Sequence, residues 1–87
     1  MGELLMFYGT ECVHCHEMLP LLDRLEEEEH LVVKKIETWH NSKNTELLRT
    51  LDTIECGGVP FFYNENTKKT LCGAVPFERL KKWALGL

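Results

Sequence analysis

Hydrophobic positions near the start of the chain form an uninterrupted run, Leu4 to Tyr8, which ends at Gly9. A run of this length without polar residues is typical of a strand that is buried on both faces of a parallel sheet. Beyond it, apolar residues recur at intervals of three and four, which predicts an amphipathic helix: Cys15, Met18, Leu19, Leu22 and Leu25. Pro20 falls inside that helix and removes a backbone hydrogen bond, so we expect one helix with a bend.

The rest of the chain repeats this change from strand to helix patterns. The segment Leu31 to Trp39 predicts a second strand, and Val59 to Tyr63 with Thr70 to Cys72 predicts a β-hairpin. Between the second strand and the hairpin, the helical spacing of four apolar residues predicts another helix: Leu47, Leu48, Leu51 and Ile54. The Gly-Gly pair that follows is expected to end this helix. Pro76 suits the first position of a last helix. The predicted order is therefore β-α-β-α-β-β-α.

Composition restricts the class of protein and its partners. With 87 residues and 44% hydrophobic content the chain can bury one core, so residues 1–87 are predicted to form a single domain. The net charge of -4 and the acidic run Glu26 to Glu29 disfavour a nucleic-acid or membrane surface. No secretory signal or bilayer-spanning segment is visible, so we expect a cytoplasmic monomer. In that compartment, cysteines are more often reduced, catalytic or metal-bound than joined in structural disulfides.

The candidate chemistry lies in the segment Glu11 to His16, which reads ECVHCH. Cys-x-x-Cys followed by His occurs in redox dithiols, in c-type haem attachment sites and in zinc sites. Haem attachment would use both cysteines and His16, and it would need export and a mostly helical fold, which the strand patterns disfavour. A zinc site would need a second pair of ligands, but Cys56 and Cys72 stand far apart in the sequence. A redox dithiol is therefore the favoured interpretation.

Longer motifs around the cysteines resemble the thioredoxin superfamily over nearly the whole chain. CHEMLPLLD is similar to that family's active-site helix, in which a proline also follows the second cysteine by five residues, here Pro20. GGVPFF resembles the segment with the family's cis-proline, here Pro60, and LCGAV resembles a glycine turn beside the substrate groove, here Gly73. The resemblance implies a minimal thioredoxin-like α/β fold of order β-α-β-α-β-β-α, in which three helices flank a four-stranded mixed sheet.

The resemblance also implies a thiol–disulfide oxidoreductase that uses the Cys12–Cys15 pair and needs no cofactor or metal. Cys12 stands at the helix N-terminus, where backbone N–H groups and the helix dipole favour a thiolate, so it is the expected nucleophile. Cys15 is expected to resolve the mixed disulfide. The partners would be protein disulfides or thiols, with an unidentified reductase or glutathione. Whether the protein reduces, oxidises or isomerises depends on its reduction potential and stays open.

Charged neighbours are predicted to tune the Cys12 thiolate. His14 stands directly before the second cysteine, where the family's disulfide-forming oxidases also place histidine, and its protonated form would stabilise the thiolate. A role as an ordinary solvated histidine is equally open for His14. Glu11 and Glu17 would act in the opposite direction, because their negative charges disfavour a nearby thiolate.

Three residues outside the cysteine motif are predicted to contact substrate. The resemblance implies that a cis Pro60 turns the Val59 backbone toward the cysteines, where it could pair with an extended substrate segment. An ordinary trans proline at a strand start is the alternative. Gly73 is the turn residue that would line the same groove.

Two further functions stay open for the same fold. Glutathione-dependent glutaredoxins usually carry an acidic pair at the start of the last helix, where this chain has Ala74, Val75 and Pro76. A non-catalytic module that binds a metal or a partner protein is the other alternative, and the intact cysteine pair makes redox turnover the preferred prediction.

Cys56 and Cys72 are predicted to be unpaired thiols. In a thioredoxin-like arrangement the first hairpin strand would separate them by more than the roughly 7 Å that a disulfide spans between Cα atoms. Free cysteine is also readily buried as a small apolar residue.

Overall fold

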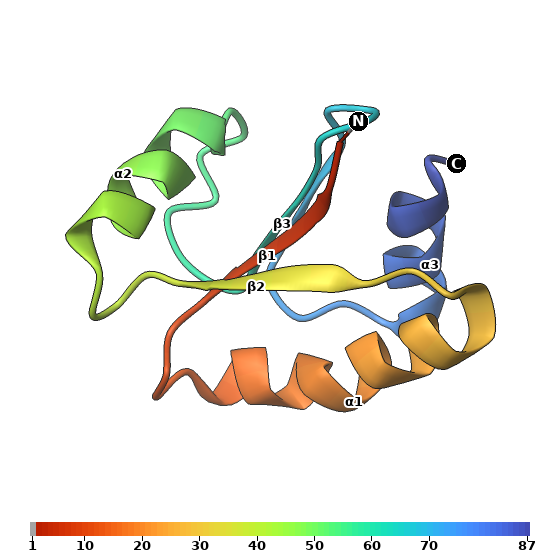
Figure 1. Cartoon of the computed structure of the whole chain (residues 1–87). Coiled ribbons are helices and arrows are strands. Elements are labelled where there is room, and N and C mark those ends of the chain that lie inside the picture. The colour runs from red at the N-terminus through yellow and green to blue at the C-terminus, as the bar shows by residue number, and fades with distance from the viewer. Residues whose placement is uncertain (1) are drawn as a thin grey trace.

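The computed structural model describes residues 2–87, which form a mixed four-stranded sheet with helices on both faces (Figure 1). The strands are β1 (Leu4–Tyr8), β2 (Val33–Glu37), β3 (Phe61–Asn64) and β4 (Thr70–Cys72). The helices are α1 (Val13–Glu29), α2 (Ser42–Leu51) and α3 (Phe77–Leu85). The predicted α/β class, with three helices and a four-stranded mixed sheet, is confirmed, and the elements follow the predicted order.

The sheet has the strand order β2-β1-β3-β4, so β1 lies in its interior. β1 pairs with β2 in parallel and with β3 in antiparallel orientation, and Met6 at its centre lies opposite Lys35 and Phe62. Two strand neighbours and helices on both faces leave β1 no exposed side, which explains its uninterrupted apolar sequence. Strands β2 and β4 form the edges of the sheet.

Alternate residues of β1 enter two separate cores, because successive side chains of a strand point to opposite faces. Leu4 and Met6 pack in the larger core with α1 and α3. Leu5 and Phe7 pack in the smaller core with α2. Figure 1 shows the same division, with α1 and α3 on one side of the sheet and α2 on the other. Both cysteines of the Cys-x-x-Cys motif belong to the larger core.

The predicted bounds of two strands are wrong: the second strand is two residues shorter at each end, and the first hairpin strand begins two residues later. The second strand is Val33–Glu37 rather than Leu31 to Trp39, because its pairing with β1 extends only from Val33 opposite Leu4 to Glu37 opposite Tyr8. The first hairpin strand begins at Phe61, since the residues before it form a loop next to the cysteines.

The helix bounds differ from the predicted ones in two places. α1 continues through Pro20 as expected, and Pro76 is the residue before α3 rather than its first residue. α2 ends at Leu51, six residues before the Gly-Gly pair, so the prediction that this pair ends the helix is wrong. Asp52 caps a separate turn there, because its carboxylate accepts the N–H groups of Cys56 and Gly57 at 2.8 and 2.9 Å. Within residues 2–87, no helix combines the length and the apolar content needed to cross a membrane.

Candidate redox site

The loop between β1 and α1 places both cysteines at the start of α1. The Cys12 N–H donates to the Gly9 carbonyl at 3.0 Å and closes a tight turn directly after β1. Cys12 is the N-cap residue of α1, and its Sγ accepts the N–H of Cys15 at 3.1 Å. This satisfies one of the N–H groups that a helix start leaves without a partner. The helix start therefore presents a donor and the positive end of its dipole to Sγ of Cys12.

Cys12 and Cys15 form a disulfide, with their Cα atoms 5.2 Å apart. Their separation by one helical turn allows this approach without displacement of the backbone. Both residues are largely buried, with 5% and 2% of their surface exposed. The predicted pair is thus present at the predicted place, with Cys15 the more enclosed of the two.

The segment that leads into β3 borders the first cysteine. Sγ of Cys12 lies 3.9 Å from the carbonyl oxygen of Val59, and the Val59–Pro60 peptide bond is cis, as the resemblance implied. The Pro60 carbonyl accepts the N–H of Gly73 at 2.8 Å. Gly73 has φ 81°, a conformation that glycine adopts without the steric cost that a Cβ atom would bring. The structure therefore joins the three predicted substrate-contacting residues into one connected unit next to Cys12.

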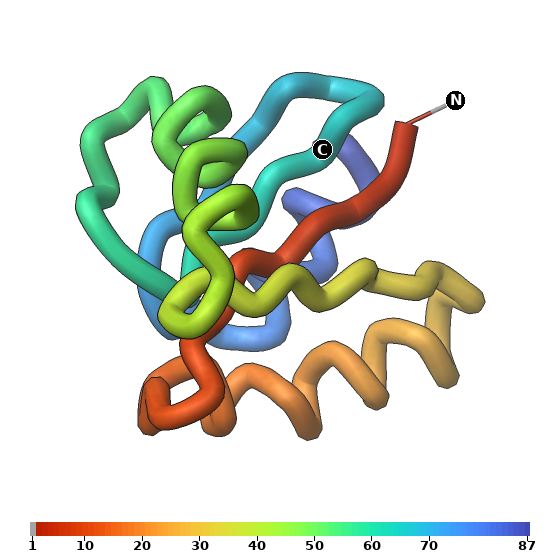
Figure 2. The backbone as a smooth tube through the Cα atoms, turned by 60° about the vertical axis from the view of Figure 1, so that its left-hand side comes forward, coloured from red at the N-terminus to blue at the C-terminus, as the bar shows by residue number. Residues whose placement is uncertain are grey.

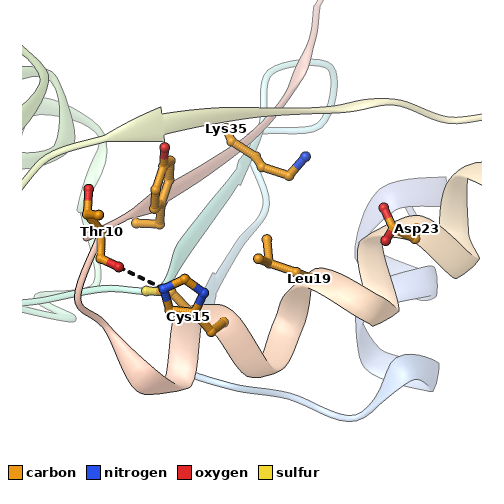
Figure 3. A pocket seen from close by; sticks show the side chains of 7 residues that line it. Thr10, Cys15, Leu19, Asp23 and Lys35 are labelled. Carbon is orange, nitrogen blue, oxygen red and sulfur yellow. Dashed lines mark hydrogen bonds between the residues drawn. The ribbon is translucent and has the colours of Figure 1, made fainter.

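A pocket of about 450 Å³ lies beside Cys15 (Figure 3). His16 stands at its edge, where Nε2 donates to the carbonyl oxygen of Thr10 at 2.7 Å. Lys35 from β2 and Asp23 from α1 also line the pocket, so it contains side chains of both charges. Sequence reasoning did not identify this pocket, because it depends on the packing of α1 against the parallel pair β1 and β2.

A network of charged side chains fixes the loop that precedes Cys12 in the sequence. Nε2 of His40 lies 2.7 and 2.9 Å from the two carboxylate oxygens of Glu11. The Glu37 carboxylate accepts the N–H and hydroxyl of Thr10 at 3.0 and 3.1 Å, and the N–H of His40 at 2.8 Å. Glu37 thus ties the residues before Cys12 to the loop after β2. Sequence reasoning missed Glu37 and His40, although the ends of two parallel strands, Tyr8 and Glu37, are paired neighbours.

These contacts shift two pKa values in opposite directions. The hydrogen bond to Glu11, and then the charge of that carboxylate, raise the pKa of His40. Desolvation acts to raise the pKa of Glu37, but hydrogen bonds from the His40 and Thr10 N–H groups outweigh it and lower the pKa. A protonated His40 therefore compensates the negative charge of Glu11, the residue adjacent to Cys12.

The predicted tuning residue His14 has a different partner. Its Nδ1 lies 3.1 Å from a carboxylate oxygen of Glu17, and the two side chains are 73% and 58% exposed. The His40–Glu11 pair is similarly exposed, at 61% for each side chain, so solvent weakens the field of both pairs. Tuning by His14 stays a prediction, and His40 joins it as a second histidine near Cys12.

Replacing His40 by alanine is expected to slow alkylation of Cys12 in the reduced protein, because the unpaired Glu11 charge then disfavours the thiolate. His40 is positive below its raised pKa and neutral above it. The loss relative to wild type should therefore be present at about pH 6 and disappear at higher pH. The measurement is the alkylation rate of Cys12 against pH.

A double variant provides the control for this prediction. Glu11→Gln combined with His40→Ala removes both charges and should restore the alkylation rate toward that of wild type. Equal rates for wild type and His40→Ala at low pH would contradict the role of His40.

The turn at Gly9 is closed to any larger residue. A Cβ atom at this position would overlap the indole ring of Trp39, which packs on the glycine. Gly9→Ala is therefore expected to lower the free energy of unfolding by about 1–3 kcal/mol, as overpacking does elsewhere. At Gly58 a Cβ atom would meet no atom within 4 Å among the described residues other than its chain neighbours. Gly58→Ala should thus change the free energy of unfolding by at most about 0.5 kcal/mol. Urea denaturation measures both variants, and equal losses of unfolding free energy in Gly9→Ala and Gly58→Ala would refute the overlap argument.

The prediction that Cys56 and Cys72 are unpaired is wrong. They form a second disulfide, with Cα atoms 5.6 Å apart. β4 is an edge strand in which Leu71 points into the larger core, so the next residue, Cys72, points to the face that carries α2. The loop after α2 crosses that face and brings Cys56 to it. In Figure 2 this loop, in green, descends beside the light-blue end of β4.

Haem attachment and zinc binding, the other two interpretations of the cysteine motif, make different demands on the fold. Haem attachment required a mostly helical fold, whereas residues 2–87 contain a four-stranded sheet. A zinc site required several ligands in one place, and among residues 2–87 no three His, Cys, Asp or Glu side chains gather suitably for a metal ion. The four cysteines pair two by two instead.

Neither a protein-family model nor a curated protein matches the chain. The functional argument therefore depends on the geometry and chemistry of the site itself.

Proposed function

We propose that this protein is a thiol–disulfide oxidoreductase with a thioredoxin-like fold. The observation that carries the proposal is the Cys12–Cys15 disulfide at the N-terminus of α1, with the Val59 carbonyl 3.9 Å from Sγ of Cys12. A thiolate attacks disulfides, and a helix N-terminus favours the thiolate of its first cysteine. The sheet order β2-β1-β3-β4 and the cis bond before Pro60 support the proposal for the fold.

The chemistry uses two exchange steps. In the reducing direction, the Cys12 thiolate attacks one sulfur of a substrate disulfide, which forms a mixed disulfide and releases the other substrate thiolate. The Cys15 thiolate then attacks Sγ of Cys12, which releases the second substrate thiolate and forms the Cys12–Cys15 disulfide. Two electrons pass from the protein to the substrate, and the substrate thiolates take up two protons. The oxidising direction runs through the same steps in reverse.

The residues Gly57–Pro60, here named the substrate-binding segment, are proposed to position the substrate. They approach Cys12 through the Val59 carbonyl, and the Gly73 N–H fixes the Pro60 carbonyl at 2.8 Å. An extended peptide that pairs with this backbone would place its disulfide over Cys12. Backbone pairing is independent of the substrate's side chains, so protein disulfides are the proposed substrate class.

The electron donor is proposed to be a protein reductase rather than glutathione bound at the last helix. The residues at the start of α3, where an acidic pair would hold glutathione, include a buried Val75 and the N-cap residue Pro76, whose side chain makes no capping hydrogen bond. We also propose a cytoplasmic setting. The apolar run Leu4 to Tyr8 forms an interior strand of the sheet, so these residues belong to the folded domain and are not the hydrophobic segment of a signal peptide.

Redox titration and turnover together test the proposal. The Cys12–Cys15 disulfide should open and close reversibly in dithiol redox buffers, and the reduced protein should reduce a protein disulfide such as that of insulin catalytically. Replacing the dithiol by glutathione and glutathione reductase should give slower turnover. Faster turnover with glutathione would favour the glutaredoxin-like function, and no turnover with either donor would refute the proposed enzyme.

A further inference from the structure

The second disulfide, Cys56–Cys72, closes a covalent loop around the substrate-binding segment and the β3–β4 hairpin. Its cysteines are 16 residues apart, and Gly57–Pro60 begins directly after Cys56. At the other end, the residue after Cys72 is Gly73, whose N–H donates to the Pro60 carbonyl at 2.8 Å. The bond therefore joins the start of the substrate-binding segment to the strand end that supports its last residue.

The two disulfides contact neighbouring peptide groups. Sγ of Cys56 lies 3.7 Å from the carbonyl oxygen of Gly58, and Sγ of Cys12 lies 3.9 Å from that of Val59. Peptide groups are planar and rigid, so a displacement at Gly58 is transmitted directly to the next residue. A change at Cys56 thus acts one residue away from the carbonyl that borders Cys12.

The second disulfide is also the more accessible one. Cys72 is exposed on the edge strand β4 and Cys56 is half-buried, whereas only 5% of Cys12 and 2% of Cys15 is exposed. Thiol–disulfide exchange needs access of the attacking thiolate to a sulfur atom. An external thiolate therefore has a route to the Cys72 end of this bond in the folded protein.

Contacts other than the disulfide also hold this loop. The Asp52 carboxylate accepts the N–H groups of Cys56 and Gly57 at 2.8 and 2.9 Å, and Pro60 and Phe61 are buried. None of these contacts requires the disulfide. Its reduction is therefore expected to loosen the substrate-binding segment locally while the sheet stays intact.

We propose that Cys56–Cys72 is a second redox site, opened by an external dithiol, whose state regulates the reactivity of Cys12. One thiolate of the dithiol attacks Sγ of Cys72 and releases the Cys56 thiolate, which takes up a proton. In the resulting mixed disulfide, the second thiolate of the dithiol attacks the dithiol's own bonded sulfur and releases the Cys72 thiolate, which takes up a proton. The dithiol is left as a disulfide and the protein with two thiols. The regulatory part of the proposal rests on the proposed function of Cys12–Cys15.

The first experiment isolates the second site. In the Cys12→Ser/Cys15→Ser variant, Cys56–Cys72 is expected to open and close reversibly in dithiothreitol redox buffers while circular dichroism shows a folded protein throughout. Alkylation followed by mass spectrometry counts the thiols at each ratio. A bond that opens only after denaturant unfolds the protein would be purely structural and would overturn the proposal.

The second experiment measures the coupling without turnover. Cys12 is the only free thiol in Cys15→Ser, which keeps the second disulfide, and in Cys15→Ser/Cys56→Ser/Cys72→Ser, which lacks it. Iodoacetamide is expected to alkylate Cys12 several-fold faster in the second protein, because the Val59 carbonyl is then less firmly held over Sγ. Equal rates would overturn the regulatory role, and a matching pair with alanine at positions 56 and 72 tests whether the serine hydroxyls cause the difference.

Turnover separates this proposal from the proposed function. With an insulin substrate, Cys56→Ser/Cys72→Ser should show a raised KM, since a less ordered segment binds substrate more weakly. Absence of turnover in the wild type would refute the proposed function, whereas the redox titration and the alkylation rates would still decide the second site. Identical KM values for wild type and variant would contradict regulation.

Discussion

Replacing Cys12 by serine is expected to reduce disulfide exchange to the rate of the reductant alone. A serine hydroxyl does not ionise at neutral pH, so the N-cap position of α1 no longer carries a nucleophile, and Cys15 is the more enclosed of the two cysteines, with 2% of its surface exposed against 5% for Cys12. The measurement is the initial rate of insulin reduction with dithiothreitol as donor. Residual catalysis near the wild-type rate would show that another cysteine is the nucleophile.

Replacing Cys15 by serine should instead accumulate the mixed disulfide. The backbone N–H of residue 15, which donates to Sγ of Cys12 at 3.1 Å, is kept in this variant, so Cys12 stays activated while its resolving partner is lost. Non-reducing electrophoresis and mass spectrometry would detect the trapped substrate. The double variant Cys12→Ser/Cys15→Ser is the matched control and should trap nothing, and equal trapping by the two single variants would contradict the assigned roles.

Truncation of Phe62 to alanine is expected to have the second large effect, a loss of about 3–5 kcal/mol of unfolding free energy. Phe62 is fully buried in β3, opposite Met6, and its ring packs on Trp83 in a T-shaped arrangement with centroids 5.4 Å apart. The surrounding sheet and helices cannot collapse fully into the space that the ring leaves. Urea denaturation followed by circular dichroism measures the loss.

An exposed apolar residue provides the control for this cavity argument. Val32 is 67% exposed, so Val32→Ala should change the unfolding free energy by at most about 0.5 kcal/mol. Phe62→Leu should lie between the two, because it removes less volume. A Phe62→Ala protein as stable as wild type would show that the larger core does not depend on this ring.

The parts of the fold that could be predicted have local causes. The apolar run of β1 and the helical spacing of α1 are visible within single segments, and both elements occur where they were predicted. Bounds failed where a long-range contact decides them. β2 ends because β1 ends, and α2 ends where Asp52 caps a new turn.

The same distinction applies to the candidate site. The spacing of Cys12 and Cys15 by one helical turn is a local property, so their disulfide could be anticipated. The pairing of His40 with Glu11 joins residues 29 positions apart and requires the parallel register of two strands. No local pattern around either residue indicates that contact.

By itself, the sequence determined the α/β class, the order of the elements and the position of the cysteine pair at a helix start. Each of these follows from the periodicity of apolar residues or from spacing within one element. Only the tertiary structure decided that Cys56 meets Cys72 and that His40 pairs with Glu11. Those contacts depend on the strand order and on the face to which each strand residue points, and a change of register by one residue would reverse every such face.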